Sequence, residues 1–239
     1  MLEGSIDCLS FVVVGAGKSK RFLHHKKKIF YRINDQIPVF IFLLKNIKDV
    51  FKEKAEIIFV HSNEDKQEIE ELLDYHNLGY VKLVEGGDQR PVSVLNGLLK
   101  SSNETVFIHD CARPFLSEQL LFLLYKRFKE SEKPIAPYIT PIDTVRIQEN
   151  GYVRTLDRNK VMLIQTPQVV KKSLYLPILK KNIENEIFLT DDVEYLIKEG
   201  IEVEFVEGDR NNVKITNPQD INIIETIYKG WVNESRNRY

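Results

Sequence analysis

The feature that most constrains this chain is the alternation of short apolar, β-rich runs with segments of helical pattern. Several of the early runs are apolar throughout, as in a parallel sheet that is covered on both faces. The run 201–206 differs, because apolar and acidic residues alternate in it, and it favours a half-exposed, antiparallel strand. We expect strands at residues 9–14, 56–61, 80–84, 105–109, 135–139, 201–206 and 213–216.

Helix-capping residues stand at the starts of the helical patterns. Ser, Thr, Asn and Asp at such positions accept hydrogen bonds from the free N–H groups of a first turn. The expected starts are Ser62 or Asn63, Ser117, Thr190 ahead of two aspartates, and Asn217-Pro218. Strands that alternate with helices predict the α/β class: a Rossmann-like, doubly wound, mostly parallel twisted sheet, whose ligands bind at the carboxyl ends of the strands.

One region, residues 137–166, breaks the alternation. Two β-prone runs, 144–147 and 152–155, flank Asn150-Gly151, a dipeptide typical of a two-residue hairpin turn. A hairpin that projects from an α/β domain has little surface of its own against which to bury its apolar face. We therefore expect a single domain, residues 1–239, with a protruding β-hairpin arm at 137–166 that serves dimerisation.

Charge and cysteine content exclude several classes of protein. The 239 residues carry a formal net charge of −1, so a strongly basic nucleic-acid-binding protein is not expected. Cys8 and Cys111 are the only cysteines, too few for a disulfide framework, which fits a reducing cytoplasm. The longest apolar run, 37–44, is far shorter than the ~20 residues of a membrane helix. We expect a cytoplasmic protein that binds neither nucleic acid nor membrane.

A glycine-rich loop follows the first expected strand. Gly15 and Gly17 let the backbone approach an anion closely, and the N–H groups of such a turn bind phosphate. A Walker A loop requires glycine where Val12 stands, and a dinucleotide fingerprint requires glycine where Lys20 stands. Six basic residues with no acid among them lie within eleven positions: Lys18, Lys20, Arg21, Lys26, Lys27 and Lys28. The segment predicts a phosphate-binding loop; a glycine turn before a solvated basic face is the alternative.

Two further strand ends carry residues suited to a nucleotide site. Asp110 follows the fourth expected strand, where a carboxylate is able to hold Mg²⁺ beside phosphates, and Arg113 is placed for a second anion. A second glycine turn, Gly86-Gly87, follows the third expected strand. Taken singly, Asp110 also suits a turn cap that pairs with Arg113, and the glycines suit an ordinary strand-to-helix turn. Together, the three features converge on one edge of the sheet.

These pieces, in this order, resemble the 2-C-methyl-D-erythritol 4-phosphate cytidylyltransferase family over nearly the whole chain. Ser19 departs from the family's second loop glycine, and Ile29 from its usual Gln. Lys26 and Lys27 stand where the family often has a proline before its lysine. The segments that match are residues 15–22, 27–30, 86–94, 109–114, 155–158, 165–168, 190–192 and 212–216.

The resemblance implies a cytidylyl transfer from CTP to a sugar-alcohol phosphate, with pyrophosphate as the leaving group. It implies that Arg21 and Lys28 stabilise the transition state, and that Asp110 holds Mg²⁺. The catalytic set that it implies is completed by Arg158 and Lys214. The implied nucleotide-binding residues are Gly15, Ala16, Gly17, Lys18, Ser19, Gly87, Asp88, Ser93 and Asp110. The implied acceptor-binding residues are Arg113, Thr144, Arg158, Thr166 and Lys214. Family members are homodimers in which the β-arm completes the neighbour's site.

Three other functions compete with this one. Ribitol-5-phosphate cytidylyltransferase shares the fold and the nucleotide loop, but residues 155–158 and 190–192 favour the methylerythritol enzyme. A P-loop kinase or ATPase is suggested by Gly17-Lys18-Ser19 and opposed by Val12. A non-catalytic nucleotide-binding protein is opposed by the retention of both Arg21 and Lys28.

Overall fold

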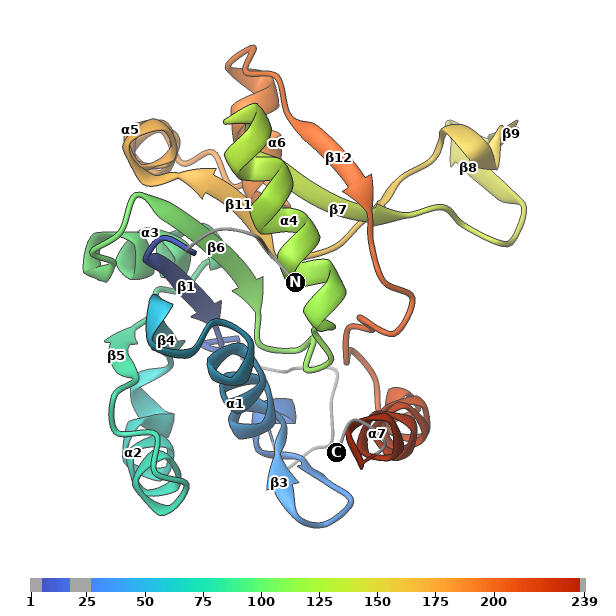
Figure 1. Cartoon of the computed structure of the whole chain (residues 1–239). Coiled ribbons are helices and arrows are strands. Elements are labelled where there is room, and N and C mark those ends of the chain that lie inside the picture. Colours follow the sequence, from blue (N-terminus) through green and yellow to red (C-terminus); the bar gives the residue numbers. More distant parts are fainter. Residues whose placement is uncertain (1–5, 18–26, 237–239) are drawn as a thin grey trace.

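One eight-stranded sheet organises the protein, whose computed structural model describes residues 6–17 and 27–236 (Figure 1). The strand order is β10-β7-β11-β6-β1-β4-β5, and β12 pairs with β7. Four neighbouring strands are mutually parallel: β5 (Lys82–Glu85), β4 (Ala55–His61), β1 (Leu9–Val14) and β6 (Thr105–Asp110). They are the apolar runs of the first half of the chain, so the predicted parallel core is confirmed.

The second half of the sheet mixes strand directions. Strand β11 (Gln168–Lys171) is antiparallel to both β6 and β7 (Ile135–Ile139), and β10 (Leu163–Ile164) is antiparallel to β7. The prediction for 201–206 was wrong in direction, because β12 (Glu204–Glu207) runs parallel to β7. Its alternating pattern indicated how exposed the strand is, but a pattern of exposure carries no information about direction.

Helices cover both faces of the sheet, as expected for a doubly wound fold. Alternate strand residues point to opposite faces, so Phe11 and Val13 of β1 join one apolar cluster and Val12 joins the other. The first face is covered by α1 (Val39–Phe51), α2 (Lys66–Tyr75) and α4 (Glu118–Ser131), and the second by α3 (Arg90–Lys100), α5 (Lys172–Glu184) and α6 (Asp192–Lys198). Within the described part of the chain, each helix is too short or too polar to cross a membrane.

A smaller third cluster lies beyond the edge of the sheet. The C-terminal helix α7 (Asp220–Arg236) packs against the short hairpin of β2 (Arg32–Ile33) and β3 (Ile37–Pro38). Ile33, Phe115, Ile215 and Ile224 are buried between them. The single-turn helices are η1 (Lys28–Phe30), η2 (Lys52–Lys54), η3 (Asn63–Asp65) and η4 (Arg158–Lys160).

Two local predictions near the C-terminus need correction. Residues 213–216 form no strand, although the Ile215 N–H donates a hydrogen bond to the Ala112 carbonyl at 2.8 Å. This single hydrogen bond attaches the segment to the loop after β6, but a strand would need a series of such bonds to a neighbouring strand. Helix α7 begins at Asp220, not at Asn217-Pro218, because the Asp220 and Ile221 N–H groups bond to carbonyls three residues back, which makes the segment before the helix a turn. The Asp220 carboxylate accepts the Thr216 and Asn217 N–H groups at 2.7 and 2.8 Å and holds this turn against the helix.

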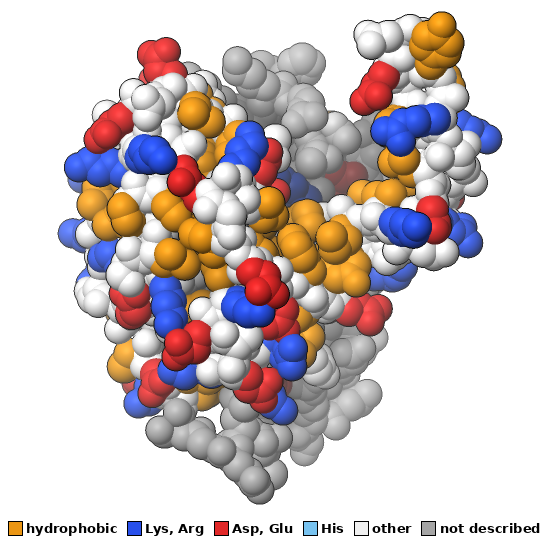
Figure 2. Space-filling view, turned by 90° about the horizontal axis from the view of Figure 1, so that it is seen from above, with side chains coloured by type: hydrophobic (Ala, Val, Ile, Leu, Met, Phe, Trp, Pro, Cys, Tyr) orange, Lys and Arg blue, Asp and Glu red, His pale blue; other side chains and the backbone are white. Residues whose placement is uncertain are grey.

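The predicted hairpin is present. Strands β8 (Val145–Glu149) and β9 (Tyr152–Leu156) pair over five positions and project from the body beside β7 (Figure 1). Asn150 and Gly151 have φ of 49° and 83°, the left-handed values that a two-residue hairpin turn requires. Viewed from above, the arm stands clear of the body and carries basic side chains on its surface (Figure 2). The expected dimerisation through this arm stays a prediction, as does the single-domain boundary.

Candidate active site

A cavity of about 190 Å³ opens at the carboxyl ends of the central parallel strands. Its walls come from the loops after β1, β5 and β6, together with η1 and the segment after β12. The lining residues are Val14, Gly15, Ala16, Gly17, Lys28, Ile29, Gly87, Asp88, Gln89, Arg90, Ser93, Asp110, Cys111, Ala112 and Lys214. The three strand ends that the sequence singled out therefore meet at one place, where ligands of open α/β sheets bind.

Two glycines allow the loops around the cavity to approach one another. A Cβ atom at Gly86 would lie 2.5 Å from the Cβ of Ala16 and 2.7 Å from the Ser93 hydroxyl. A Cβ atom at Gly15 would lie 2.6 Å from the Phe59 ring. A side chain at Gly86 would therefore push the two glycine loops apart, and one at Gly15 would displace the Phe59 ring of β4. The Ser93 hydroxyl accepts the Gly87 N–H at 3.1 Å, which fixes the second glycine turn on the first turn of α3.

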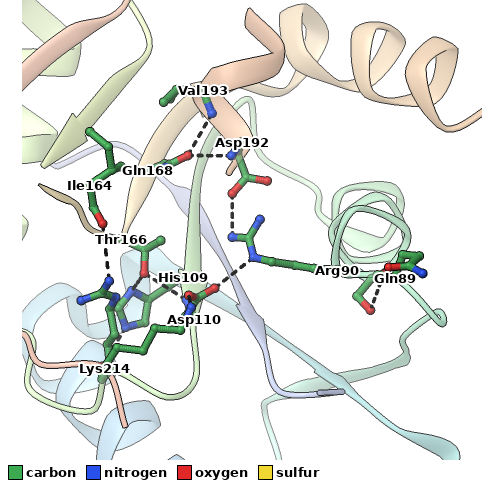
Figure 3. A network of polar contacts seen from close by, with 12 residues as sticks. Gln89, Arg90, His109, Asp110, Ile164, Thr166, Gln168, Asp192, Val193 and Lys214 are labelled. Carbon is green, nitrogen blue, oxygen red and sulfur yellow. Dashed lines mark hydrogen bonds and ion pairs between the residues drawn. The ribbon is translucent and has the colours of Figure 1, made fainter. Parts of the chain in front are cut away.

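Four charged residues form a connected network at the cavity, and we call them the cavity network: Arg90, Asp110, Asp192 and Lys214 (Figure 3). Arg90, Asp110 and Lys214 line the cavity, and Asp192 lies buried behind Arg90. Arg90 lies between two carboxylates, with its Nε 3.1 Å from Asp110 and its terminal nitrogen 2.8 Å from Asp192. Lys214 binds the other Asp110 oxygen at 2.6 Å. Asp192 is fully buried and also accepts the Tyr175 hydroxyl at 3.0 Å. Two cations thus balance two carboxylates at the base of the site.

The pKa values in the network follow from this pairing. Burial by itself raises the pKa of Asp110, but the charges of Arg90 and Lys214 outweigh it and hold that pKa far below the usual range. Burial opposes the charge on Arg90, yet Asp192 and Asp110 reverse the effect and raise its pKa. Asp110 is therefore a permanently ionised carboxylate at neutral pH.

A second set of hydrogen bonds fixes the backbone of Asp110. His109 Nε2 lies 2.8 Å from the Arg113 carbonyl, which only accepts, so this nitrogen carries the proton. His109 Nδ1 then accepts the Thr166 hydroxyl at 2.9 Å, and the Thr166 oxygen accepts the Asp110 N–H at 3.1 Å. Burial lowers the pKa of His109 to about 4, consistent with a neutral ring.

Lys28 brings a further positive charge to the cavity wall. It belongs to η1, lines the cavity, and donates to the Ile215 carbonyl at 3.2 Å. Ile215 neighbours Lys214 in the sequence, so this bond holds Lys28 against the segment that carries the second cavity lysine. A cavity with backbone turns on one side and cationic side chains on the other is suited to bind polyphosphate.

Comparison with known proteins identifies the family. The model of the 2-C-methyl-D-erythritol 4-phosphate cytidylyltransferase family matches residues 9–229. The chain belongs to this family. A relative of that name from Clostridium botulinum is 32% identical over 222 residues, 92% of this chain and 98% of the relative. One from Caldanaerobacter subterraneus is 34% identical over 228 residues, 92% of this chain and 99% of the relative.

Solved structures give the same result. The 4-diphosphocytidyl-2C-methyl-D-erythritol synthase of Anaerococcus prevotii superposes with a TM-score of 0.81 at 27% identity, covering 93% of this chain and 96% of that one. The cytidylyltransferase of Thermus thermophilus superposes with a TM-score of 0.72 at 25% identity, covering 91% and 98%. A cytidylyltransferase fold and a family match over nearly the whole chain displace the P-loop kinase as an explanation of Gly17-Lys18-Ser19.

The cytidylyltransferase structure brings together most of the described residues that the sequence proposed. Those that line the cavity are Gly15, Ala16, Gly17, Lys28, Gly87, Asp88, Ser93, Asp110 and Lys214. Lys18, Ser19 and Arg21 lie outside the described residues. The proposed roles of all of these residues stay predictions.

Four proposed acceptor residues lie outside this cavity lining. Thr166 is buried beneath Asp110, and the Arg113 guanidinium donates to the Asn212 carbonyl at 2.8 Å. Both support the site from below. Thr144 and Arg158 are exposed on the arm, where Arg158 donates to the Ile142 carbonyl.

Sequence reasoning missed Arg90 and Asp192 as site residues. Arg90 stands in the second glycine motif and Asp192 beside the expected helix start, where it was read only as a carboxylate suited to the helix dipole. In the structure Asp191 caps α6, its carboxylate accepting the Glu194 N–H at 3.0 Å, while Asp192 turns inward to Arg90. The two successive aspartates at the start of the expected helix were the available signal in the sequence. They did not indicate that Arg90 is the partner of Asp192.

Proposed function

We propose that the chain transfers a cytidylyl group from CTP to 2-C-methyl-D-erythritol 4-phosphate. The products are pyrophosphate and 4-diphosphocytidyl-2-C-methyl-D-erythritol, an intermediate of non-mevalonate isoprenoid biosynthesis. The observation that carries the proposal is the meeting of Lys28, Lys214 and Asp110 in one cavity, between the two glycine turns. The family membership of the chain supports the choice of substrates.

The chemistry is an in-line displacement at phosphorus. A phosphate oxygen of the acceptor forms a bond to the α-phosphorus of CTP, and the bond from that phosphorus to the β-phosphate bridging oxygen breaks. The acceptor phosphate is already ionised, so no general base is required, but two anions must meet. Lys28, together with Arg21 seven positions earlier in the sequence, is assigned to the charge that develops on the phosphoryl oxygens. Lys214 is assigned to the acceptor phosphate.

The second glycine turn is assigned to the nucleoside. Gly87 and Asp88 present backbone and carboxylate groups at the cavity wall, and Ser93 lies beneath them. Hydrogen-bonding groups in fixed positions distinguish bases by their edges, because a mismatched base leaves a polar group without a partner. The phosphates then extend toward Gly15, Ala16 and Gly17.

We assign Asp110 as the protein ligand for Mg²⁺. Within residues 6–17 and 27–236, no cluster of three acidic, His or Cys residues is placed to hold a metal. Mg²⁺ is commonly held by one or two carboxylates with the rest of its shell from phosphates and water, so a single carboxylate fits. Each Asp110 oxygen makes one charged contact, which leaves lone pairs for a cation. When bound, the ion would neutralise charge on the α- and β-phosphates.

The arm is assigned to the acceptor site of a second copy. Thr144 and Arg158 are exposed and lie on a projection that stands clear of the chain's own body (Figure 2). In a homodimer, a symmetric interface would place each arm against the other subunit. Because Cys8 and Cys111 are both free thiols, we also assign the protein to the cytoplasm.

Pyrophosphate release from CTP tests the proposal. Methylerythritol phosphate should support turnover in the presence of Mg²⁺, while ribitol 5-phosphate should support little. Turnover with ribitol 5-phosphate alone would replace the acceptor assignment by that of the ribitol-phosphate enzyme. Absence of release with either acceptor would favour a non-catalytic nucleotide-binding protein.

A further inference from the structure

Lys27 lies directly before the cavity lysine and makes contacts unlike those of its neighbour. Its ammonium donates to Asp65 at 2.7 Å and to the Ser62 hydroxyl at 2.9 Å. The same nitrogen lies 3.3 Å from the exposed Glu64. The Ser62 hydroxyl also donates to Asp65, at 2.5 Å. Lys27 therefore belongs to a compact polar cluster in the turn that follows β4.

This cluster is a fixed attachment point in the protein body. Asp65 is buried, with a side chain only 10% exposed, and Lys27 is 21% exposed. Asp65 ends η3, and α2 follows it directly along the chain. A partly buried ion pair with a shared hydroxyl partner is geometrically better defined than an isolated surface pair.

Helix η1, which carries Lys28, is too short to hold its own position. A three-residue 3₁₀ turn gains few hydrogen bonds; here the Phe30 N–H donates to the Lys27 carbonyl at 3.0 Å. Its later residues are anchored by packing, since Ile29 is buried and the Phe30 ring meets Phe40 edge-on at 5.9 Å. On the N-terminal side of η1, the contact of Lys27 with Asp65 is the attachment. Lys28 therefore lies between this ion pair and the packed side chains of Ile29 and Phe30.

We propose that Lys27 is a positioning residue, whose ion pair with Asp65 fixes the start of η1 and so holds Lys28 at the cavity. The expected effect on turnover rests on the proposed function. The expected effect on the position of Lys28 does not. The backbone of Lys27 has φ −70° and ψ 139°, within the range that proline imposes on its own φ. A proline at this position would fix the backbone φ covalently through its ring. In this chain the ion pair of the Lys27 side chain would hold the backbone in the same conformation.

Proline substitution separates this role from a general need for the lysine charge. Lys27→Ala should lower kcat roughly 10- to 100-fold, because a small displacement of a charged group is costly at a reacting centre. The KM for CTP should change far less. Lys27→Pro removes the same ammonium but restores the backbone constraint, so it should retain most of the wild-type kcat. Asp65→Asn should resemble Lys27→Ala.

Lys66→Ala is the matched control for charge and location. Lys66 adjoins Asp65 in sequence, but its side chain is 54% exposed and its ammonium lies 3.7 Å from the half-exposed Glu70. Turnover should be unchanged in this variant. A Lys27→Ala enzyme with near-normal kcat would overturn the proposal, and so would a Lys27→Pro enzyme as impaired as Lys27→Ala.

Crystal structures of the Lys27 variants give a readout that does not depend on turnover. The contact from Lys28 to the Ile215 carbonyl should be lost or displaced in Lys27→Ala and kept in Lys27→Pro. An unchanged contact in Lys27→Ala would contradict the positioning role of Lys27. If the wild-type protein released no pyrophosphate with either acceptor, the proposed function would fail while this structural comparison would still decide the role of Lys27.

Discussion

The cavity network and the β8–β9 arm present charged residues in opposite ways. Arg90, Asp110 and Asp192 come from three elements of the body and hold one another in a largely buried cluster (Figure 3). Among the strands of the described residues, β8 and β9 pair only with each other, over five positions, and Arg158 at the base of the arm is exposed. The chain's own tertiary structure fixes the first set, whereas the second set is fixed locally and presented outward. Chemistry assigned to the arm therefore needs a second surface, while the cavity network does not.

The largest effect should come from breaking the network at its buried end. Asp192→Ala removes a buried carboxylate that binds Arg90 and Tyr175, and leaves the partly buried Arg90 side chain with one partner fewer. Loss of one member of a buried ion pair costs about 3–5 kcal/mol. Urea unfolding followed by circular dichroism should show this loss.

Asp191→Ala is the matched control, since the neighbouring carboxylate caps α6 and takes no part in the ion pair to Arg90. It should cost about 0.5–2 kcal/mol, the usual value of an N-cap. If the two variants were equally stable, the ion pair to Arg90 would contribute no more than a helix cap, and the contrast with the arm would weaken.

A second variant addresses the charge in the cavity. Lys28→Ala should lower kcat roughly 10²- to 10³-fold, as does loss of one preorganised group that stabilises developing charge. The unfolding curve should stay close to wild type, because Lys28 is only partly buried. Lys100→Ala, at the exposed end of α3, should change neither quantity. A Lys28→Ala enzyme that turns over normally would refute the catalytic assignment.

Mixing variants tests whether the arm works across a dimer. Lys28→Ala and Arg158→Ala subunits should each be impaired alone, the second chiefly in its use of the acceptor. Co-refolded mixtures should regain roughly a quarter of wild-type activity, because half of the dimers would contain one site free of both substitutions. Activity no higher than the average of the two variants would mean that the arm serves its own subunit or none.

The smallest effect concerns acid stability. Glu56 on β4 is buried against Lys82, Ser10 and Ser102; burial tends to raise its pKa, but these partners together lower it to about 2. A carboxylate with a lowered folded pKa contributes stability above its unfolded pKa of about 4.5, and this is lost as the pH falls toward 2.

The wild-type free energy of unfolding should therefore decline across that window, and Glu56→Gln should show a shallower decline. Glu149→Gln, on the exposed face of the arm, should leave the acid limb as it is in wild type. If the free energy of unfolding fell equally with pH in Glu56→Gln and wild type, the ionised Glu56 would contribute nothing to the stability of the fold.

The contrast between the two regions also explains what the sequence could predict. The arm was predictable because its information is local: Asn150-Gly151 specifies the turn, and the flanking runs specify the strands. Ser117 likewise caps α4 as expected, accepting the Leu120 N–H at 3.3 Å. The apolar central strands were predictable for the same reason, since burial on both faces shows in the run itself.

The network was not predictable from one sequence. Arg90 and Asp192 are 102 positions apart, and no periodicity connects them. The direction of β12 and the loop character of 213–216 also depend on distant partners. Of the residues that the resemblance proposes, those of the two glycine turns that the structure describes line the cavity, whereas the side chains of Arg113 and Thr166 bond to backbone groups and to His109. Their functional roles stay predictions.

The balance of charge in the cavity network has a kinetic consequence. The charges of its two carboxylates and two cations sum to zero, so the network exerts little long-range electrostatic attraction on an approaching polyphosphate. Six basic residues without an acid lie between positions 18 and 28 in a protein of net charge −1. Attraction of the nucleotide from solution should then depend on this basic stretch of the sequence, so the association rate should fall with ionic strength, while the chemical step should be far less sensitive to salt.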